Sequence, residues 1–406
     1  MEYQTFVLPN GIKLIHIQVV SPVAHCGFLI NTGSRDEAEH EHGMAHFIEH
    51  LLFKGTKKRK AFHVLSRLDD VGGDLNAYTT KEETCIHASF LKDYYERTIE
   101  LISDIVFNST FPEKSLESEK DVIIDEINSY KDSPSELIFD DYEDHFFLNH
   151  PLGRNILGKT KSLKKYQRSN IISFINKNYN TDQMVFTSVG SISFSKLVHY
   201  FEKHFKDIPA NIRSTTRAPF QNFQQFNTSL KKNTFQIHAI LGSLGYDLKD
   251  PRRMVLHLLS NIIGGPGMIS RLNLALRERK GYSYNIESSY NPYSDTGIFT
   301  IYFSTDKEYL EKCLDIIHKE LNSLRNKPLG TMQLQKAKQQ ITGQLAISFE
   351  SNENQMLSIG KSYLVYDRVD TMEEIYAKIA SVTSAEILDI AKEVLDNDRL
   401  SMLVYK

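Results

Sequence analysis

Apolar and polar positions alternate along the chain with periods that predict strands in some segments and helices in others. The first residues, MEYQTFVLPNGIKLIHI, read as a strand, a turn at Asn10-Gly11 and a second strand, because Asn-Gly between two such runs is a hairpin signal. In ESEKDVIIDEINSY, residues 117–130, the positions of Ile123 and Ile127 have helical spacing. Strands and helices alternate without any low-complexity segment, and we therefore expect an α+β protein.

Two segments of the first half resemble two segments of the second half. Residues 93–106, DYYERTIELISDIV, resemble residues 307–321, KEYLEKCLDIIHKEL. Residues 169–189 resemble residues 384–404, and both resemblances hold at an offset of 215 positions. Two matches at one offset indicate a duplicated α+β domain, each copy ending in a helix and then a strand.

The chain has 406 residues, which exceeds one ordinary hydrophobic core and predicts two domains of about 200 residues each. The best candidate for a linker is IPANIRSTTRAPFQ, residues 208–221, which carries Pro209, Pro219 and little apolar periodicity. We therefore expect one domain over residues 1–207 and a homologous one over residues 222–406.

Composition and charge narrow the class of protein. The hydrophobic fraction of 41% and the charged fraction of 24% are those of a globular protein. The net charge of -3 gives no electrostatic reason to expect nucleic acid as a partner. The basic run between Lys54 and Lys60 is interpreted as a solvated loop.

The chain shows no targeting signal in its first residues and no stretch of 18 or more apolar residues, so we expect no membrane partner. The three cysteines, Cys26, Cys85 and Cys313, are scattered and odd in number, which fits a reducing compartment and offers no cysteine metal cluster. These features predict a cytoplasmic protein.

The pentapeptide HFIEH, residues 46–50, sits in an otherwise apolar segment. In a helix, His46, Glu49 and His50 would form one polar stripe, while Phe47 and Ile48 would occupy other faces. Much of such a helix would be buried, and buried polar groups need partners. A metal ion would satisfy all three, whereas histidines that merely cap and pack a buried helix are the alternative.

A catalytic zinc site usually has three protein ligands, so a third is needed. Glu119 and Glu126 are seven residues apart, two turns along one face of the predicted helix. Glu126 would bind the metal and Glu119 would orient a ligating imidazole, although both would also be ordinary as surface acids. In the second copy position 46 maps near Asn261, in SNIIGGPG, so the chemistry is expected in the first half.

Four motifs carry a family resemblance: NTGSRDE from Asn31, HFIEHLLFKGT from His46, GGDLNAYT from Gly72, and LRERKGYSY from Leu276. With 75 residues between His50 and Glu126, the chain resembles a half-length bacterial-type member of the pitrilysin-type metallopeptidases, family M16, which have an inverted zinc motif. This resemblance implies that His46, His50 and Glu126 bind one Zn2+ per chain and that Glu49 is the general base. It also implies two homologous domains in a clamshell that closes over an extended peptide.

The resemblance further assigns Arg277 and Tyr284, seven positions apart in RERKGYSY. Tyr284 would donate its phenol to the oxyanion that forms during amide hydrolysis, and Arg277 would hold the peptide backbone or a carbonyl. Tyr282, two positions earlier, is the rival and is expected to face the other side of a strand.

The segment GGDLNAYT resembles the edge strand to which the family's extended substrates add. Asn76, Ala77 and Tyr78 are expected to form backbone hydrogen bonds with the peptide. An ordinary inner strand after a Gly-Gly turn is the alternative.

Together these features predict a zinc-dependent endopeptidase that hydrolyses extended peptides or unfolded segments by a zinc-activated water, with Glu49 as general base. The alternatives are a non-catalytic scaffold or processing-complex subunit of the same fold, and a zinc hydrolase with another substrate. Because half-length members commonly assemble from two chains, we expect a homodimer.

Overall fold

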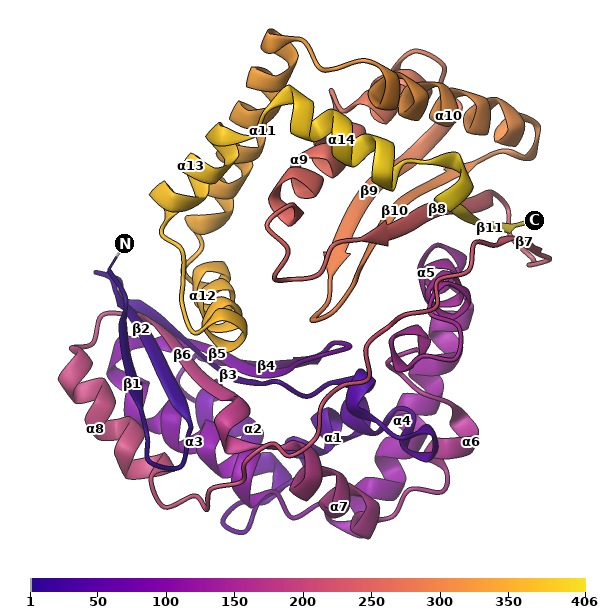
Figure 1. Cartoon of the computed structure of the whole chain (residues 1–406). Coiled ribbons are helices and arrows are strands. Elements are labelled where there is room, and N and C mark those ends of the chain that lie inside the picture. Colours follow the sequence, from indigo (N-terminus) through magenta and orange to yellow (C-terminus); the bar gives the residue numbers. More distant parts are fainter. Residues whose placement is uncertain (1) are drawn as a thin grey trace. The chain divides into compact units, whose positions relative to one another are not determined.

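A computed structural model describes residues 2–406, and the chain forms two compact units. Each unit contains one sheet with helices on both faces (Figure 1), which confirms the α+β class. The first unit comprises the chain up to Asn128, Arg154–Arg217 and Ala346–Thr371. The second unit comprises Ser129–Gly153, Ala218–Leu345 and Met372–Lys406.

The sheet of the first unit has six strands in the order β1-β2-β6-β3-β5-β4. Its strands are β1 (Gln4–Val7), β2 (Lys13–Gln18), β3 (Val23–Ile30), β4 (Asp74–Thr79), β5 (Thr84–Leu91) and β6 (Met184–Gly190). The hairpin expected at Asn10-Gly11 is confirmed, since β1 and β2 pair antiparallel and Gly11 has a φ of 95°. Only β2 and β6 pair in parallel, and β4 is the outermost strand.

Helices cover both faces of this sheet. They are α1 (Met44–Leu52), α2 (Ala61–Asp69), α3 (Tyr95–Asn108), α4 (Glu113–Lys131), α6 (Thr160–Leu163), α7 (Arg168–Asn178), α8 (Phe194–Phe205) and α12 (Asn352–Tyr366). Most of them build one large core, in which Phe28 of β3 and Phe205 of α8 stack with ring centroids 5.3 Å apart. On the other face, Met356 and Ile359 of α12 pack against Val185 of β6.

The sheet of the second unit has five strands in the order β7-β11-β8-β10-β9. They are β7 (Asn227–Leu230), β8 (Ile237–Gly245), β9 (Ser283–Pro292), β10 (Gly297–Thr305) and β11 (Ser401–Tyr405). The order β11-β8-β10-β9 repeats the order β6-β3-β5-β4 of the first unit, as a duplication at an offset of 215 positions requires. The prediction of two homologous sheet-and-helix domains is thus confirmed.

The helices of this unit are α5 (Pro134–Phe146), α9 (Arg253–Gly264), α10 (Leu310–Asn326), α11 (Thr331–Phe349), α13 (Met372–Ser381) and α14 (Ser384–Val394). Helices α9, α10 and α14 contribute to the core on one face of the sheet. On the other face, Tyr142 and Phe146 of α5 are buried with Ile240 of β8 and Tyr405 of β11.

The units differ from the expected halves, residues 1–207 and 222–406, in two helices. Helix α5 comes from the first half of the sequence but covers the sheet of the second unit, and α12 from the second half covers the sheet of the first. Each helix buries apolar side chains on a sheet that is distant in sequence, so position along the chain does not decide its unit. The chain passes between the units at several points, and one of these passages, after Arg217, lies inside the expected linker.

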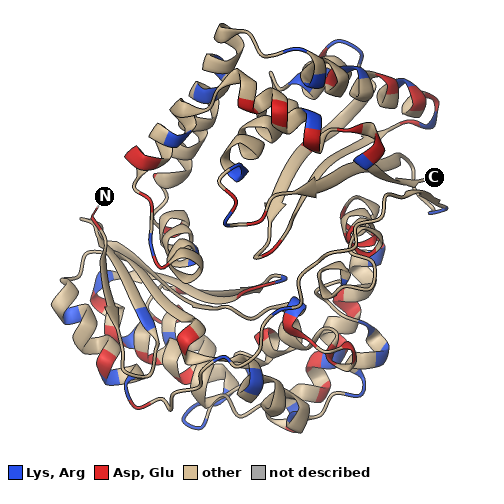
Figure 2. Ribbon diagram, in the orientation of Figure 1, with Lys and Arg blue, Asp and Glu red and all other residues tan. Residues whose placement is uncertain are grey.

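Positively and negatively charged residues are interspersed along the helices (Figure 2), and the net charge of the chain is -3. Among residues 2–406, every helix is too short or too polar to cross a bilayer.

Candidate metal and catalytic site

Helix α1 places its polar residues as the sequence spacing requires. Phe47, Ile48 and Leu51 are fully buried in the core of the first unit. His46 and His50 lie one turn apart with ring centroids 4.6 Å apart, and His46 is only 8% exposed. The helix thus presents two imidazoles side by side at the margin of the core.

Glu126 of α4 faces both imidazoles. Its Oε2 lies 3.8 Å from Nε2 of His46 and 3.6 Å from Nε2 of His50, and one ligand atom from each residue lies within 4.8 Å of the others. Both distances exceed an ordinary N–H···O hydrogen bond. Tetrahedral zinc ligands at about 2.0–2.1 Å from the metal are roughly 3.3 Å apart, so this donor set fits a zinc ion.

Glu119 lies two turns before Glu126 on the same helix and is 4% exposed. Its Oε1 is 3.1 Å from Nδ1 of His50, and its Oε2 is 2.6 Å from Nζ of Lys54. A hydrogen bond from Nδ1 favours the tautomer that leaves the Nε2 lone pair free to bind a metal. Lys54 belongs to the basic run that was expected to be a solvated loop, but its ammonium forms an ion pair with the second oxygen of Glu119.

His46 is held differently. Its Nδ1 is buried and has no hydrogen-bond partner within residues 2–406. Burial, together with the neighbouring His50, lowers the pKa of His46 to about 4. The imidazole is therefore neutral near pH 7, which is the form that binds a metal.

Glu49 lies on α1 between the two histidines in sequence. Its Oε2 accepts a hydrogen bond of 2.6 Å from the Oγ1 hydroxyl of Thr79, the last residue of β4. Burial raises the pKa of Glu49, while the hydrogen bond from Thr79 acts in the opposite direction. Sequence reasoning missed Thr79, because no local pattern pairs it with a residue 30 positions earlier.

The strand expected to bind substrate, residues 76–78, lies within β4. It pairs with β5 on one side, and β4 is the outermost strand of the sheet. Ala77 packs against the core of the first unit, whereas Asn76 is exposed and the hydroxyl of Tyr78 donates to Glu83 at 3.2 Å. Within residues 2–406 the outer edge of β4 therefore has no neighbouring strand in the sheet, and the strand ends at Thr79, the residue that contacts Glu49.

Arg277 and Tyr284 lie in the second unit and line one cavity of about 720 Å³. Arg277 comes from the π-helix Asn273–Glu278, and Tyr284 comes from the outermost strand β9 and is 71% exposed. Tyr282 is packed elsewhere, since its ring stacks on that of Tyr309 at 4.5 Å. Of the two tyrosines, Tyr284 is the more exposed.

The second unit has no counterpart of the metal group within residues 2–406. At the position that matches His46, Asn261 of α9 donates a hydrogen bond of 2.8 Å from Nδ2 to Oε1 of Gln344 on α11. In the second unit a neutral amide pair therefore joins α9 and α11. In the first unit the side chains that face one another between α1 and α4 are two imidazoles and a carboxylate.

Two family models match the chain. The model described as Insulinase (Peptidase family M16) matches residues 15–160, and the model described as Peptidase M16 inactive domain matches residues 165–341. A Bacillus subtilis protein named uncharacterized zinc protease YmxG is 31% identical over 401 residues, covering 98% of this chain and 97% of that protein. An uncharacterized zinc protease of Rickettsia bellii is 30% identical over 400 residues, covering 98% and 96%.

Two solved structures share the fold. A protease from Helicobacter pylori aligns with a TM-score of 0.91 and 20% identity, covering 100% of this chain and 99% of that chain. A peptidase M16 inactive domain from Pseudomonas fluorescens aligns with a TM-score of 0.93 and 20% identity, covering 100% and 98%. The full-length matches and the two family models confirm the resemblance read from the motifs: the chain belongs to peptidase family M16, the insulinase family.

Proposed function

We propose that this protein is a zinc-dependent endopeptidase that hydrolyses extended peptides or unfolded segments. The observation that supports it is the convergence of His46, His50 and Glu126 beside the partly buried carboxylate of Glu49. One zinc ion per chain, held by His46, His50 and Glu126, would polarise the substrate carbonyl and make a water molecule more acidic. The other steps fall to side chains of the protein.

Glu49 is the general base. Because burial raises its pKa, this carboxylate accepts a proton more readily near neutral pH than an exposed glutamate does. Thr79 fixes Oε2, and Oε1 takes a proton from the attacking water. The same proton then passes to the leaving nitrogen as the C–N bond breaks, so Glu49 ends the cycle ionised.

The outer edge of β4 is the place for the substrate backbone. An extended peptide that pairs with Asn76, Ala77 and Tyr78 would follow the strand to Thr79, whose hydroxyl contacts Glu49. Main-chain pairing recognises an extended chain rather than a particular sequence, which fits a peptidase acting on unfolded segments. A zinc hydrolase with another kind of substrate would have no use for a strand edge.

Arg277 and Tyr284 are proposed as the residues of the second unit that act on the substrate. Their shared cavity and the exposed phenol of Tyr284 support this assignment, together with the family motif. Tyr284 donates a hydrogen bond to the carbonyl oxygen as negative charge develops there, and Arg277 holds a backbone carbonyl.

The test is Glu49→Gln, which keeps the size of the side chain and an oxygen that can accept from Thr79. We expect zinc content to remain at the wild-type level while peptide hydrolysis falls by about 10²-fold or more, the usual contribution of a general base. Glu39→Gln, at an exposed acid shortly before α1, is the matched control and should change neither. Wild-type turnover by Glu49→Gln would exclude Glu49 as the base.

A non-catalytic scaffold or processing-complex subunit is the competing proposal. It predicts that purified wild-type protein binds zinc but cleaves no member of a mixed peptide library. The complete set of His46, Glu49, His50 and Glu126 in one chain favours the enzyme.

We also propose a cytoplasmic homodimer. Sedimentation equilibrium of the purified chain tests the assembly, and a single species at 46.7 kDa would contradict it.

A further inference from the structure

Helix α1 carries no capping residue of its own. Its N-cap is Gly43, with a φ of 95°, and no side chain of the N-cap accepts a hydrogen bond from the first turn. The first N–H groups of a helix have no partner within the helix, and a buried helix must find acceptors elsewhere. His46 is the third residue of α1 and therefore lies in its first turn.

The carboxylate of Glu37 supplies those acceptors. Its Oε2 accepts the N–H of Gly43 and its Oε1 accepts the N–H of Ala45, each at 2.9 Å. When Glu37 is ionised, its negative charge lies at the positive end of the helix dipole. Glu37 is 4% exposed, and burial raises its pKa to about 8, against the effect of the two amide hydrogen bonds. The chain thus keeps a carboxylate where ionising one is costly.

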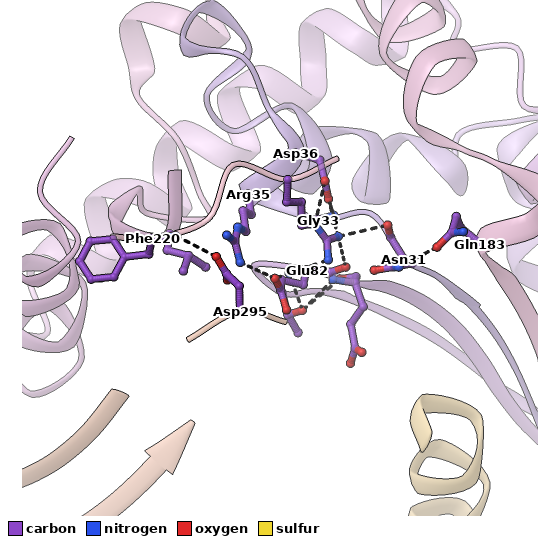
Figure 3. Close-up of polar contacts among 12 residues, drawn as sticks. Asn31, Gly33, Arg35, Asp36, Glu82, Gln183, Phe220 and Asp295 are labelled. Atoms are coloured by element: carbon purple, nitrogen blue, oxygen red, sulfur yellow. Dashed lines mark hydrogen bonds and ion pairs between the residues drawn. The ribbon is translucent and has the colours of Figure 1, made fainter. Parts of the chain in front are cut away.

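The segment that carries Glu37 is itself fixed by ion pairs (Figure 3). Arg35 is 2.7 Å from Glu82, and Asp36 is 2.7 Å from both Arg213 and Arg217. The side chains of Arg35 and Asp36 are almost fully buried, at 1% and 5% exposure. Glu37 therefore belongs to a segment whose backbone is fixed by these ion pairs.

The start of α1 is also held on its other side. Arg154 donates from Nη1 to the carbonyl oxygen of Glu37 at 2.8 Å. Gly43 and Gly158 touch backbone to backbone, and a Cβ at Gly158 would lie 2.5 Å from Cα of Gly43. These contacts restrict the backbone at the start of α1. Glu37 accepts hydrogen bonds from the N–H groups of Gly43 and Ala45 there.

The two histidines of the metal group are held in different ways. His50 has its imidazole oriented directly by Glu119, whereas Nδ1 of His46 has no such partner within the described residues. The position of the His46 ring consequently depends on its backbone, and Ala45 next to it is bonded to Glu37. We propose that Glu37 is the positioning residue of His46, acting through the N-terminal turn of α1. This inference rests on the proposed zinc site.

The experiment compares Glu37→Gln with the matched control Glu41→Gln. Glu41 is a buried acid of the same segment that caps a different turn, accepting the N–H of Ala38 at 2.8 Å. A glutamine at position 37 has one acceptor oxygen and sets an NH2 group against the second amide. We expect the zinc dissociation constant of Glu37→Gln, measured against a competing chelator, to rise about 10- to 100-fold, as for other residues that orient metal ligands. Glu41→Gln should stay within about twofold of wild type.

Imidazole NMR signals of the metal-free protein give a readout that a general loss of stability would not produce. In Glu37→Gln the His46 signals should broaden or split while those of His50 stay unchanged, and Glu119→Gln should do the reverse. If Glu37→Gln does not fold by far-UV circular dichroism, Glu37→Asp, whose shorter carboxylate cannot span both amides, takes its place. Wild-type protein that binds no zinc would refute the proposed site, whereas equal zinc affinity in wild type and Glu37→Gln would refute the role of Glu37 alone.

Discussion

Glu119 and Glu126 of α4 should contribute unequally to zinc binding. Glu126 faces both imidazoles at 3.6 and 3.8 Å, whereas Glu119 contacts one imidazole, that of His50, at Nδ1 and a distance of 3.1 Å. We expect Glu126→Gln to remove a ligand and Glu119→Gln to loosen one. The two substitutions are chemically identical and lie on one face of one helix, so differences in helix propensity largely cancel.

The sizes of the two effects follow from these positions. Structural zinc sites with four ligands bind with about 10–16 kcal/mol, so one ligand is worth roughly 3–4 kcal/mol, or about 10²- to 10³-fold in the dissociation constant. Glu119 orients a ligand and should be worth about 10- to 100-fold. Its effect includes the loss of the 2.6 Å ion pair with Lys54, whose ammonium would face a neutral amide.

The assay is competition for zinc against a chromophoric chelator at pH 7.5, with metal content after dialysis as a second measurement. Glu117→Gln is the control on the same helix, because Glu117 is 71% exposed and pairs only with Lys120. Retention of zinc by Glu126→Gln as tightly as by wild type would refute the ligand set. A larger loss in Glu119→Gln than in Glu126→Gln would show that the two roles are reversed.

Tyr284→Phe should lower kcat by about 10- to 10³-fold at unchanged zinc content and nearly unchanged KM, because an oxyanion donor acts mainly in the transition state. Tyr282→Phe, the control, should change kcat little. Equal rates for Tyr284→Phe and wild type would show that Tyr284 is an ordinary surface residue. Stability should also fall in acid: burial lowers the pKa of His257 to about 4, with Arg253 adding to the effect, so between pH 6.5 and 4 the unfolded chain binds a proton that the folded chain does not. The free energy of unfolding, measured with urea, should therefore fall by at most about 3 kcal/mol because of this residue as the pH falls through that window. His257→Leu should make the free energy of unfolding depend less on pH. The same pH dependence in wild type and His257→Leu would show that His257 titrates normally in the folded protein.

Features that depend on spacing within one element could be predicted from the sequence. His46, Glu49 and His50 share a face of α1, and Glu119 and Glu126 share a face of α4, because the helical period is the same wherever the helix packs. The hairpin at Asn10-Gly11 and the duplication at 215 positions were readable for similar reasons, since a turn preference is local and an ancestral repeat keeps its offset.

Which distant elements meet depends on how the whole chain packs. That Thr79 contacts Glu49 and that Glu37 caps α1 follow from strand order and loop packing. The same holds for α5 and α12, each of which covers the sheet of the unit formed mainly by the other half of the chain. Apolar burial is not directional, so a hydrophobic stripe shows that a helix will be covered without showing by what, and that choice depends on the surfaces of the whole chain.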